Sequence, residues 1–434
     1  MVSSSFEASD EDSSFAADPS LHCAFKLGSQ EWQLAVKTRF PGFVWCSAVV
    51  LWLVHSLGAL FYRSRGDPWS HADWLISYRA GFVRRGASGS FFFWLSDISG
   101  IAVGNLVLFA QIFFAGIFFL SLAHLIARLE VDRGIIAMIL VPVGFIYVLV
   151  DPAVAGRKEI ILYALSMAWY FFETSQISVR FTGCLLSVAI VLLVLVHEGL
   201  GFFIPSLLLI SLFANPDLTW NGLFLRAVFI FPALILSFSV VVLVADSPTA
   251  QELCTPLLEA GYTAYTCTGS IGSAATGGTS GLRESIQWLL SFPGGYLAYF
   301  VVLFGGLALL VSLSRELVSS AKFRIGAGPT YLVWLCCFLA SLPIYLIAVD
   351  WGRFVNANLV QFSIAVLALK RIQSPKSTRL PTKVSRGLFL ASVIFMSTTL
   401  GISVSDAQYR SIVFTVMNFD YYRRGGLTPT VFDG

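Results

Sequence analysis

The segment Phe181–Ala214, FTGCLLSVAIVLLVLVHEGLGFFIPSLLLISLFA, is almost entirely apolar and is interrupted at His197-Glu198-Gly199. One helical crossing of a bilayer needs about 20 apolar residues, so this run suffices for one kinked helix or for two helices joined at the break. Ionisable side chains inside such a run are costly and usually have a functional or pairing role. The segment therefore predicts a membrane protein, with His197 and Glu198 as candidate functional residues.

The composition of the whole chain supports the same class. Its 434 residues are 56% hydrophobic and 12% charged, with a mean hydropathy of +0.78, whereas soluble domains carry about 25% charged residues. We therefore predict an all-α polytopic membrane protein with about eleven transmembrane helices. The predicted spans are 42–62, 103–126, 134–150, 159–175, 181–197, 199–214, 222–245, 290–314, 329–349, 354–370 and 387–405.

The distribution of lysine sets the predicted orientation. Six of the seven lysines fall on one side of the predicted spans, and the loop 370–386 is the clearest basic cluster. Basic loops stay in the cytoplasm, so we predict a cytoplasmic N-terminus and an extracytoplasmic C-terminus. The predicted regions are a partly disordered cytoplasmic tail (1–41), a transmembrane bundle (42–405) with outer loops 63–102 and 246–289, and an outer tail (406–434).

Four polar motifs fall at the outer ends of predicted spans, at residues 79–86, 151–159, 197–199 and 350–353. We expect them to form one site. Arginine and lysine suit phosphate or diphosphate, and a histidine or a carboxylate can act as a general base. The candidate substrate-binding residues are Arg79, Arg84, Arg85, Arg157, Lys158 and Arg353. The candidate catalytic residues are His197, Glu198 and Asp350, with Asp67 and Asp73 of the first outer loop as alternatives. Each motif also has a structural interpretation, either anchoring at lipid headgroups or a buried ion pair.

The outer loop 246–289 is rich in small residues and is interpreted as a flexible cover or a passive connector. Cys254 and Cys267 share this loop and could form a disulfide on the outer side of the membrane. His-Glu-Gly lacks the second histidine of a metalloprotease helix, and no Cys/His spacing predicts a zinc site. No nucleotide-binding or haem motif is visible, so we expect neither a metal nor a cofactor.

A chain of many spans that combines outer arginines with a His-Glu pair resembles the Wzy-type and related exopolysaccharide polymerases of bacteria. The resemblance extends to the tight Arg157-Lys158-Glu159 turn and to Asp350-Trp-Gly-Arg353. It implies an enzyme of the inner (plasma) membrane that polymerises polyprenyl-diphosphate-linked oligosaccharides at the outer face. The arginines would bind the lipid diphosphate, and His197 or Glu198 would deprotonate the acceptor hydroxyl. The implied partners are a lipid-linked oligosaccharide, membrane lipids and a chain-length regulator, with no nucleic acid.

Two alternatives belong to other classes. A multi-span glycosyltransferase that depends on polyprenyl phosphate would use a catalytic acid in the first outer loop, so Asp67 or Asp73 would replace His197. A transporter or flippase of an anionic lipid-linked glycan would instead distribute charges through the bilayer and show two related halves. The sequence shows neither of these transporter features clearly.

Overall fold

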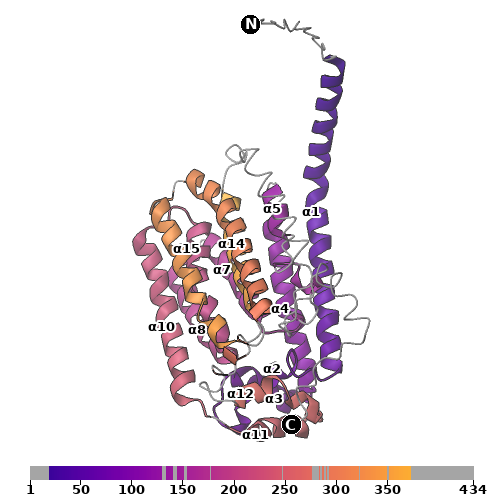
Figure 1. Ribbon diagram of the computed structural model, residues 1–434, viewed down its shortest axis with the longest axis vertical. Coiled ribbons are helices and arrows are strands. Elements are labelled where there is room, and N and C mark those ends of the chain that lie inside the picture. The colour runs from indigo at the N-terminus through magenta and orange to yellow at the C-terminus, as the bar shows by residue number, and fades with distance from the viewer. Residues whose placement is uncertain are drawn as a thin grey trace, which may run out of the picture.

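The computed structural model describes residues 19–129, 133–139, 144–150, 154–175, 177–246, 248–275, 283, 286–287, 290, 293–321, 323–348 and 351–372. Every regular element within these residues is helical (Figure 1). The elements are α1 (Pro19–Ser64), α2 (Ala72–Leu75), η1 (Tyr78–Ala80), α3 (Gly86–Ser99), α4 (Val103–Ile126), α5 (Arg133–Ile139), α6 (Tyr147–Val150), α7 (Glu159–Thr174), α8 (Val179–Val196), η3 (Glu198–Phe203), α9 (Ser206–Ala214), α10 (Trp220–Val244), α11 (Ala250–Glu259), η4 (Ala264–Cys267), α12 (Ser270–Ala275), α14 (Pro293–Ala321), α15 (Ala327–Ser341), α16 (Ile344–Ile347) and α17 (Trp351–Ile372).

Seven stretches of helix in the described residues are long and apolar enough to cross a membrane, which identifies a multi-pass membrane protein. They are Pro41–Ser64, Val103–Ile126, Val179–Val196, Trp220–Val244, Tyr299–Ser319, Ala327–Ile347 and Trp351–Ile372. Of the other predicted spans, 159–175 and 199–214 form shorter helices, 134–150 contains α5 and α6, and 387–405 lies outside the described residues. The count of eleven spans and the orientation of the termini stay predictions.

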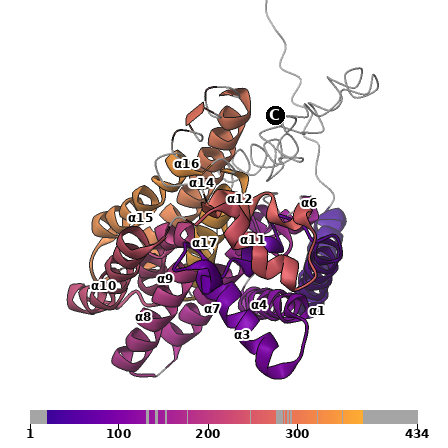
Figure 2. The same cartoon turned by 90° about the horizontal axis from the view of Figure 1, so that it is seen from below.

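The helix α17 lies in the centre of the bundle, in contact with α4, α7, α9 and α14 (Figure 2). Its membrane-spanning window is buried throughout, although it carries Arg353, Asn356 and Gln361. The Tyr163 hydroxyl donates to Asn356 Oδ1 at 2.5 Å, and Ser166 Oγ donates to Gln361 Oε1 at 2.8 Å. Such hydrogen bonds between helices fix their register where water is absent, so α7 and α17 are held side by side.

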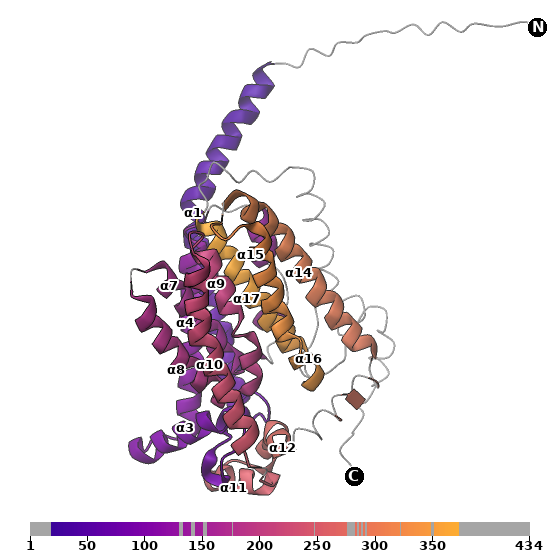
Figure 3. The same cartoon turned by 90° about the vertical axis from the view of Figure 1, so that its left-hand side faces the viewer.

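One end of the bundle is covered by short elements, namely α2, η1, α3, α11, η4 and α12 (Figures 1 and 3). The helix α3 has 14 residues, too few to cross a bilayer. It contacts α4 and α8, while Phe91, Trp94 and Ile98 stay exposed. An exposed apolar and aromatic face at the end of a membrane bundle suits the lipid–water interface.

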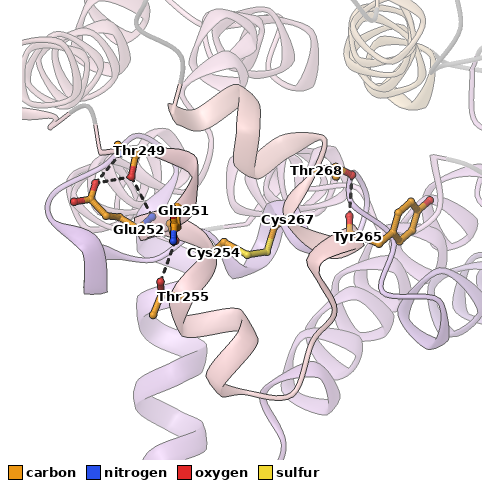
Figure 4. Close-up of a disulfide and its surroundings, with 8 residues drawn as sticks. All are labelled: Thr249, Gln251, Glu252, Cys254, Thr255, Tyr265, Cys267 and Thr268. Atoms are coloured by element: carbon orange, nitrogen blue, oxygen red, sulfur yellow. Dashed lines mark hydrogen bonds between the residues drawn. A yellow bond between two sulfur atoms is a disulfide. The ribbon is translucent and has the colours of Figure 1, made fainter. Parts of the chain in front are cut away.

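We call α11, η4 and α12 the outer cap, after the outer loop 246–289 that the sequence predicts. Cys254 and Cys267 form a disulfide that joins α11 to η4, a pairing that the sequence had left open (Figure 4). Thr249 and Glu252 form a capping box at the start of α11. Residues 248–275 of the loop therefore contain short helices that a disulfide and a helix cap hold together. Residues 276–281 of the small-residue stretch lie outside the described residues, so the choice between a flexible cover and a passive connector stays a prediction.

Candidate functional site

The polar break in Phe181–Ala214 separates two helices. Helix α8 ends at Val196, and His197 has an extended backbone with φ −163°. The Gly199 amide donates to His197 Nδ1 at 3.2 Å, and Glu198 begins the short helix η3. The sequence left open whether 181–214 is one helix or two, and the structure shows two helical segments divided at this position.

Glu198 is held by arginines of the first outer loop. Arg85 Nε donates to both carboxylate oxygens at 3.0 Å, and Arg84 Nη1 lies 3.9 Å from Oε1. Arg85 adopts a left-handed backbone conformation with φ 65° at the start of α3. A non-glycine residue in this region is uncommon and is often found at functional sites. The bidentate contact brings the Arg84-Arg85 motif onto the break between α8 and η3.

Asp73 on α2 lies beside this pair and is 2% exposed. Its carboxylate is 3.8 Å from Arg85 Nη1 and 3.7 Å from Lys158 Nζ, so it lies between two cations. Neither oxygen accepts a hydrogen bond from any described residue. Lys158 is fully buried and donates to the Val196 carbonyl at 2.8 Å. Asp73 is therefore a buried carboxylate that has charge partners and unused hydrogen-bonding capacity.

The turn that carries Arg157 and Lys158 is fixed by side chains from three other elements. The Gly156 carbonyl accepts hydrogen bonds from Trp74 Nε1 at 2.6 Å and from Gln111 Nε2 at 2.8 Å. The Gly156 amide donates to His55 Nε2 at 3.4 Å. Gly156 has φ +80°, a conformation that favours glycine. Trp74 and Gln111 were not among the predicted site residues. Gln111 is a single amide within an apolar span, and Trp74 has no charge that would set it apart from its polar neighbours.

The 154–158 turn lies inside the bundle and not at its end. Gln111 is eight residues into α4 from Val103, the end of α4 that contacts α3. At 1.5 Å per residue, this is a depth of roughly 12 Å along the helix. Gln111 Nε2 also lies 3.3 Å from the Ser70 carbonyl. The first outer loop and the 154–158 turn therefore both enter the bundle and meet at Gln111, within the candidate membrane span α4.

Arg157 and Glu159 extend away from Asp73 into a second charged group. Arg353 Nη1 lies 3.2 Å from Glu159 Oε1, while no carboxylate of the described residues pairs with Arg157. All three side chains line a small pocket of about 40 Å³. The lining residues are His55, Phe118, Phe119, Gly144, Phe145, Tyr147, Val148, Val154, Arg157, Glu159, Ile160, Tyr163, Arg353, Asn356 and Val360.

The remaining predicted site residues have other positions. Arg79 pairs with Asp97 at 2.5 Å on the exposed surface and stacks on Phe93, so it lies outside the cluster. Asp67 Oδ1 accepts from the Trp69 and Ser70 amides at 3.0 and 2.6 Å, which shapes a turn. Asp350 lies outside the described residues.

His197 is fully buried beside the cluster. Its Nδ1 accepts the Gly199 amide, so Nε2 carries the proton of the neutral ring. That Nε2 has no hydrogen-bond partner among the described residues. His197 is therefore arranged to donate a hydrogen bond rather than to accept a proton.

The outer cap contacts the first outer loop near the site, at Arg84 and at His71 among other residues. Arg84 Nη2 donates to the Ser273 carbonyl at 3.3 Å, and His71 Nε2 lies 2.9 Å from the Tyr262 hydroxyl. Burial lowers the pKa of His71 to about 4, with a further lowering from Arg63 and an opposing effect of Asp67. Burial raises the pKa of Tyr262 to about 12. The neutral forms of His71 and Tyr262 therefore join the cap to the first outer loop.

The two groups bring together several buried or half-buried charges. The cations are Arg84, Arg85, Arg157, Lys158 and Arg353, and the carboxylates among the described residues are Asp73, Glu159 and Glu198. A cluster of guanidinium and ammonium groups suits an anionic ligand such as phosphate. No group of three His, Cys, Asp or Glu side chains in the described part of the chain could hold a metal ion.

Comparison with protein-family models, with curated proteins and with solved structures finds no match to this chain.

Proposed function

We propose that this protein is a membrane glycosyltransferase that acts on a lipid-linked phosphate or diphosphate sugar, with Asp73 as the general base. The observation that carries the proposal is Asp73 itself. It is a buried carboxylate, 3.8 Å from Arg85 and 3.7 Å from Lys158, whose oxygens accept no hydrogen bond from a described residue. Such an oxygen can accept the proton of a substrate hydroxyl, whereas Glu198 is already bound to Arg85 on both oxygens.

The depth of the cluster supports a lipid-linked substrate. The first outer loop and the 154–158 turn meet roughly 12 Å below one end of α4. A ligand that reaches this position with its phosphate has its attached lipid inside the membrane region of the bundle. The cluster of arginines and a lysine suits a phosphate group that gains charge as the sugar leaves.

The chemistry follows from these positions. The acceptor hydroxyl attacks the anomeric carbon of the donor sugar, and Asp73 takes its proton. The bond between the anomeric carbon and the phosphate oxygen breaks, and its electron pair stays on that oxygen. Arg84, Arg85 and Lys158 stabilise the charge that develops on the departing lipid phosphate. In this mechanism His197 Nε2 donates a hydrogen bond, and Glu198 positions Arg85. These roles differ from the role of general base that the sequence analysis assigned to His197 or Glu198.

Polymerisation of lipid-diphosphate-linked repeat units is the second candidate. It is favoured by the separate basic group of Arg157 and Arg353, because a polymerase binds two lipid-linked substrates at once. With either function, we propose that the outer cap and the site lie on the extracytoplasmic side of the inner membrane. The Cys254–Cys267 disulfide supports this placement, because disulfides persist in oxidising compartments.

The test is complementation of a deletion strain of the native host. Asp73→Asn should reduce the surface glycan at least tenfold and cause a lipid-linked precursor to accumulate. Asp97→Asn is the matched control, because Asp97 lies in the same loop, is exposed and pairs with Arg79. Normal glycan from Asp73→Asn at a normal protein level would overturn the proposal.

The mass of the accumulated precursor distinguishes the two candidates. A complete repeat unit on its lipid indicates polymerisation, and a unit that lacks one sugar indicates transfer of a single sugar.

A further inference from the structure

The distance between Asp73 and Lys158 is not set by their own contact. Asp73 Oδ2 lies 3.7 Å from Lys158 Nζ, which is too far for a hydrogen bond, and neither Asp73 oxygen accepts one from a described residue. Opposite charges that are buried together attract each other, and when free to move they close to a charge-assisted hydrogen bond of about 2.8 Å. The surrounding structure therefore holds this pair apart.

The peptide unit of Gly156 joins the two segments that carry the pair. Its carbonyl accepts hydrogen bonds from Trp74 Nε1 at 2.6 Å and from Gln111 Nε2 at 2.8 Å, so both lone pairs of the oxygen are used. Trp74 follows Asp73 in α2, and Gly156 lies two residues before Lys158. We call Gly156 with Trp74 and Gln111 the Gly156 joint.

Two long helices anchor the Gly156 joint. Gln111 of α4 also approaches the Ser70 carbonyl, three residues before Asp73, at 3.3 Å from Nε2. His55 of α1 accepts the Gly156 amide at 3.4 Å. His55 and Gln111 are 3% exposed or less, and a buried hydrogen bond is costly to break because no water replaces it. The backbone on both sides of the charged pair is thus tied to α1 and α4.

The side chain of Lys158 is held at its far end as well. Its Nζ donates to the Val196 carbonyl at 2.8 Å. Val196 is the last residue of α8, where carbonyls have no partner within the helix. One of the three ammonium hydrogens is therefore directed to the end of α8 and not to Asp73.

We infer that Trp74 and Gln111 are positioning residues that keep Asp73 close to Lys158 and yet out of a direct hydrogen bond with it. The inference rests on the proposed function, in which an Asp73 oxygen accepts the proton of a hydroxyl. A direct bond to Lys158 would occupy that oxygen, whereas a wider gap would take the ammonium away from the departing phosphate. The Gly156 joint sets the distance at which both groups can act.

The experiment measures the coupling energy between Asp73 and Lys158 by a double-mutant cycle on unfolding of the purified full chain in detergent micelles. Asp73→Asn and Lys158→Gln are the single variants. The cycle is repeated in a Trp74→Phe background, which keeps a ring and removes the N–H donor. The pair should then close, and the coupling energy should rise at least twofold.

Trp169→Phe is the matched control. Trp169 is 2% exposed and donates from Nε1 to Ser211 Oγ at 2.8 Å, about three turns along α7 from Lys158. This variant loses the same kind of buried hydrogen bond and should leave the coupling energy between Asp73 and Lys158 unchanged.

An unchanged or lower coupling energy in Trp74→Phe overturns the inference. Gln111→Leu removes the second donor to Gly156 and replaces Trp74→Phe if that variant fails to fold, and the same result with it counts equally against the Gly156 joint. Surface glycan in the complemented deletion strain is the second readout. Trp74→Phe should reduce it at least threefold at a normal protein level, while Trp169→Phe should leave it normal.

The two readouts separate the positioning role from the proposed function. Normal glycan from Trp74→Phe, with the coupling energy raised, would overturn the positioning role, because the distance would then change without any effect on the reaction. Normal glycan from Asp73→Asn would refute Asp73 as the general base. The control of the distance by the Gly156 joint would still stand in that case, because the coupling energy is measured without any substrate.

Discussion

The Arg85–Glu198 ion pair allows a quantitative test of how the site is held together. Charges 3.0 Å apart attract each other by about 5 kcal/mol at an effective dielectric constant of 20. Desolvation of both groups offsets part of this attraction, and the Arg85 side chain is 21% exposed. We therefore expect a coupling energy of about 2–3 kcal/mol. The destabilisations caused by Arg85→Gln and by Glu198→Gln alone should therefore add up to about 2–3 kcal/mol more than the destabilisation of the double variant.

The measurement is a double-mutant cycle on the free energy of unfolding in mixed detergent micelles. Arg79 and Asp97 provide the control cycle, because this pair has a short contact of 2.5 Å and side chains that are 39% and 62% exposed. An exposed pair should couple by less than about 1 kcal/mol. Equal coupling energies in the two cycles would refute the reasoning, because burial and bidentate geometry would then add nothing to the Arg85–Glu198 pair.

Three further outcomes follow from the geometry. Gly156→Ala should lower the free energy of unfolding by about 2 kcal/mol, because φ is +80° and a Cβ would lie 2.9 Å from Gln111 Nε2. Gly100→Ala is the control, since Gly100 has φ +68° and open space around it, and it should cost about half as much. The pKa of His71 falls from 6.5 to about 4 on folding, so its contribution to stability is complete above pH 6.5 and is lost as the pH falls through 4. The loss should reach about 3 kcal/mol, and unfolding of His71→Gln should lack this pH dependence. A cysteine at exposed Tyr265 should react with an impermeant maleimide in intact cells, whereas one at exposed Ile177 should react only after permeabilisation; the reverse pattern would overturn the orientation.

Hydropathy predicted the helical class and the position of most long spans, because lipid imposes apolar runs of fixed length. It also predicted α7 and the 134–150 segment as full crossings, and neither is among the seven candidate spans of the described residues. Helix α7 has 16 residues and begins at a turn that lies inside the bundle. A hydropathy profile records which residues are apolar and carries no information on the depth at which a helix begins.

The candidate site was predicted in part. The sequence identified Arg84, Arg85, Lys158 and Glu198, which the structure brings together. It could not rank the two acids of the first outer loop, because Asp67 and Asp73 are six residues apart in similar surroundings. Folding separates them, since Asp67 shapes a turn and Asp73 faces two cations.

The same limit explains Arg79. It shares a motif with Arg84 and Arg85, and sequence proximity alone grouped the three arginines together. The short helix η1 and the turn after it direct Arg79 toward Asp97, away from the cluster. Side-chain direction in a loop depends on turns that polar spacing does not specify.

The central position of α17 has a consequence for biogenesis. Among the seven candidate spans it has the lowest mean hydropathy, 1.3, and it carries an arginine and several amides within its sequence. Charged and amide side chains oppose the partition of an isolated helix from the translocon into lipid. We expect α17 to enter the bilayer only after α7 and α9 are in place to accept its polar groups. Membrane insertion of this segment would then depend on segments synthesised about 150 to 200 residues earlier, and its topology would be set late in synthesis rather than helix by helix.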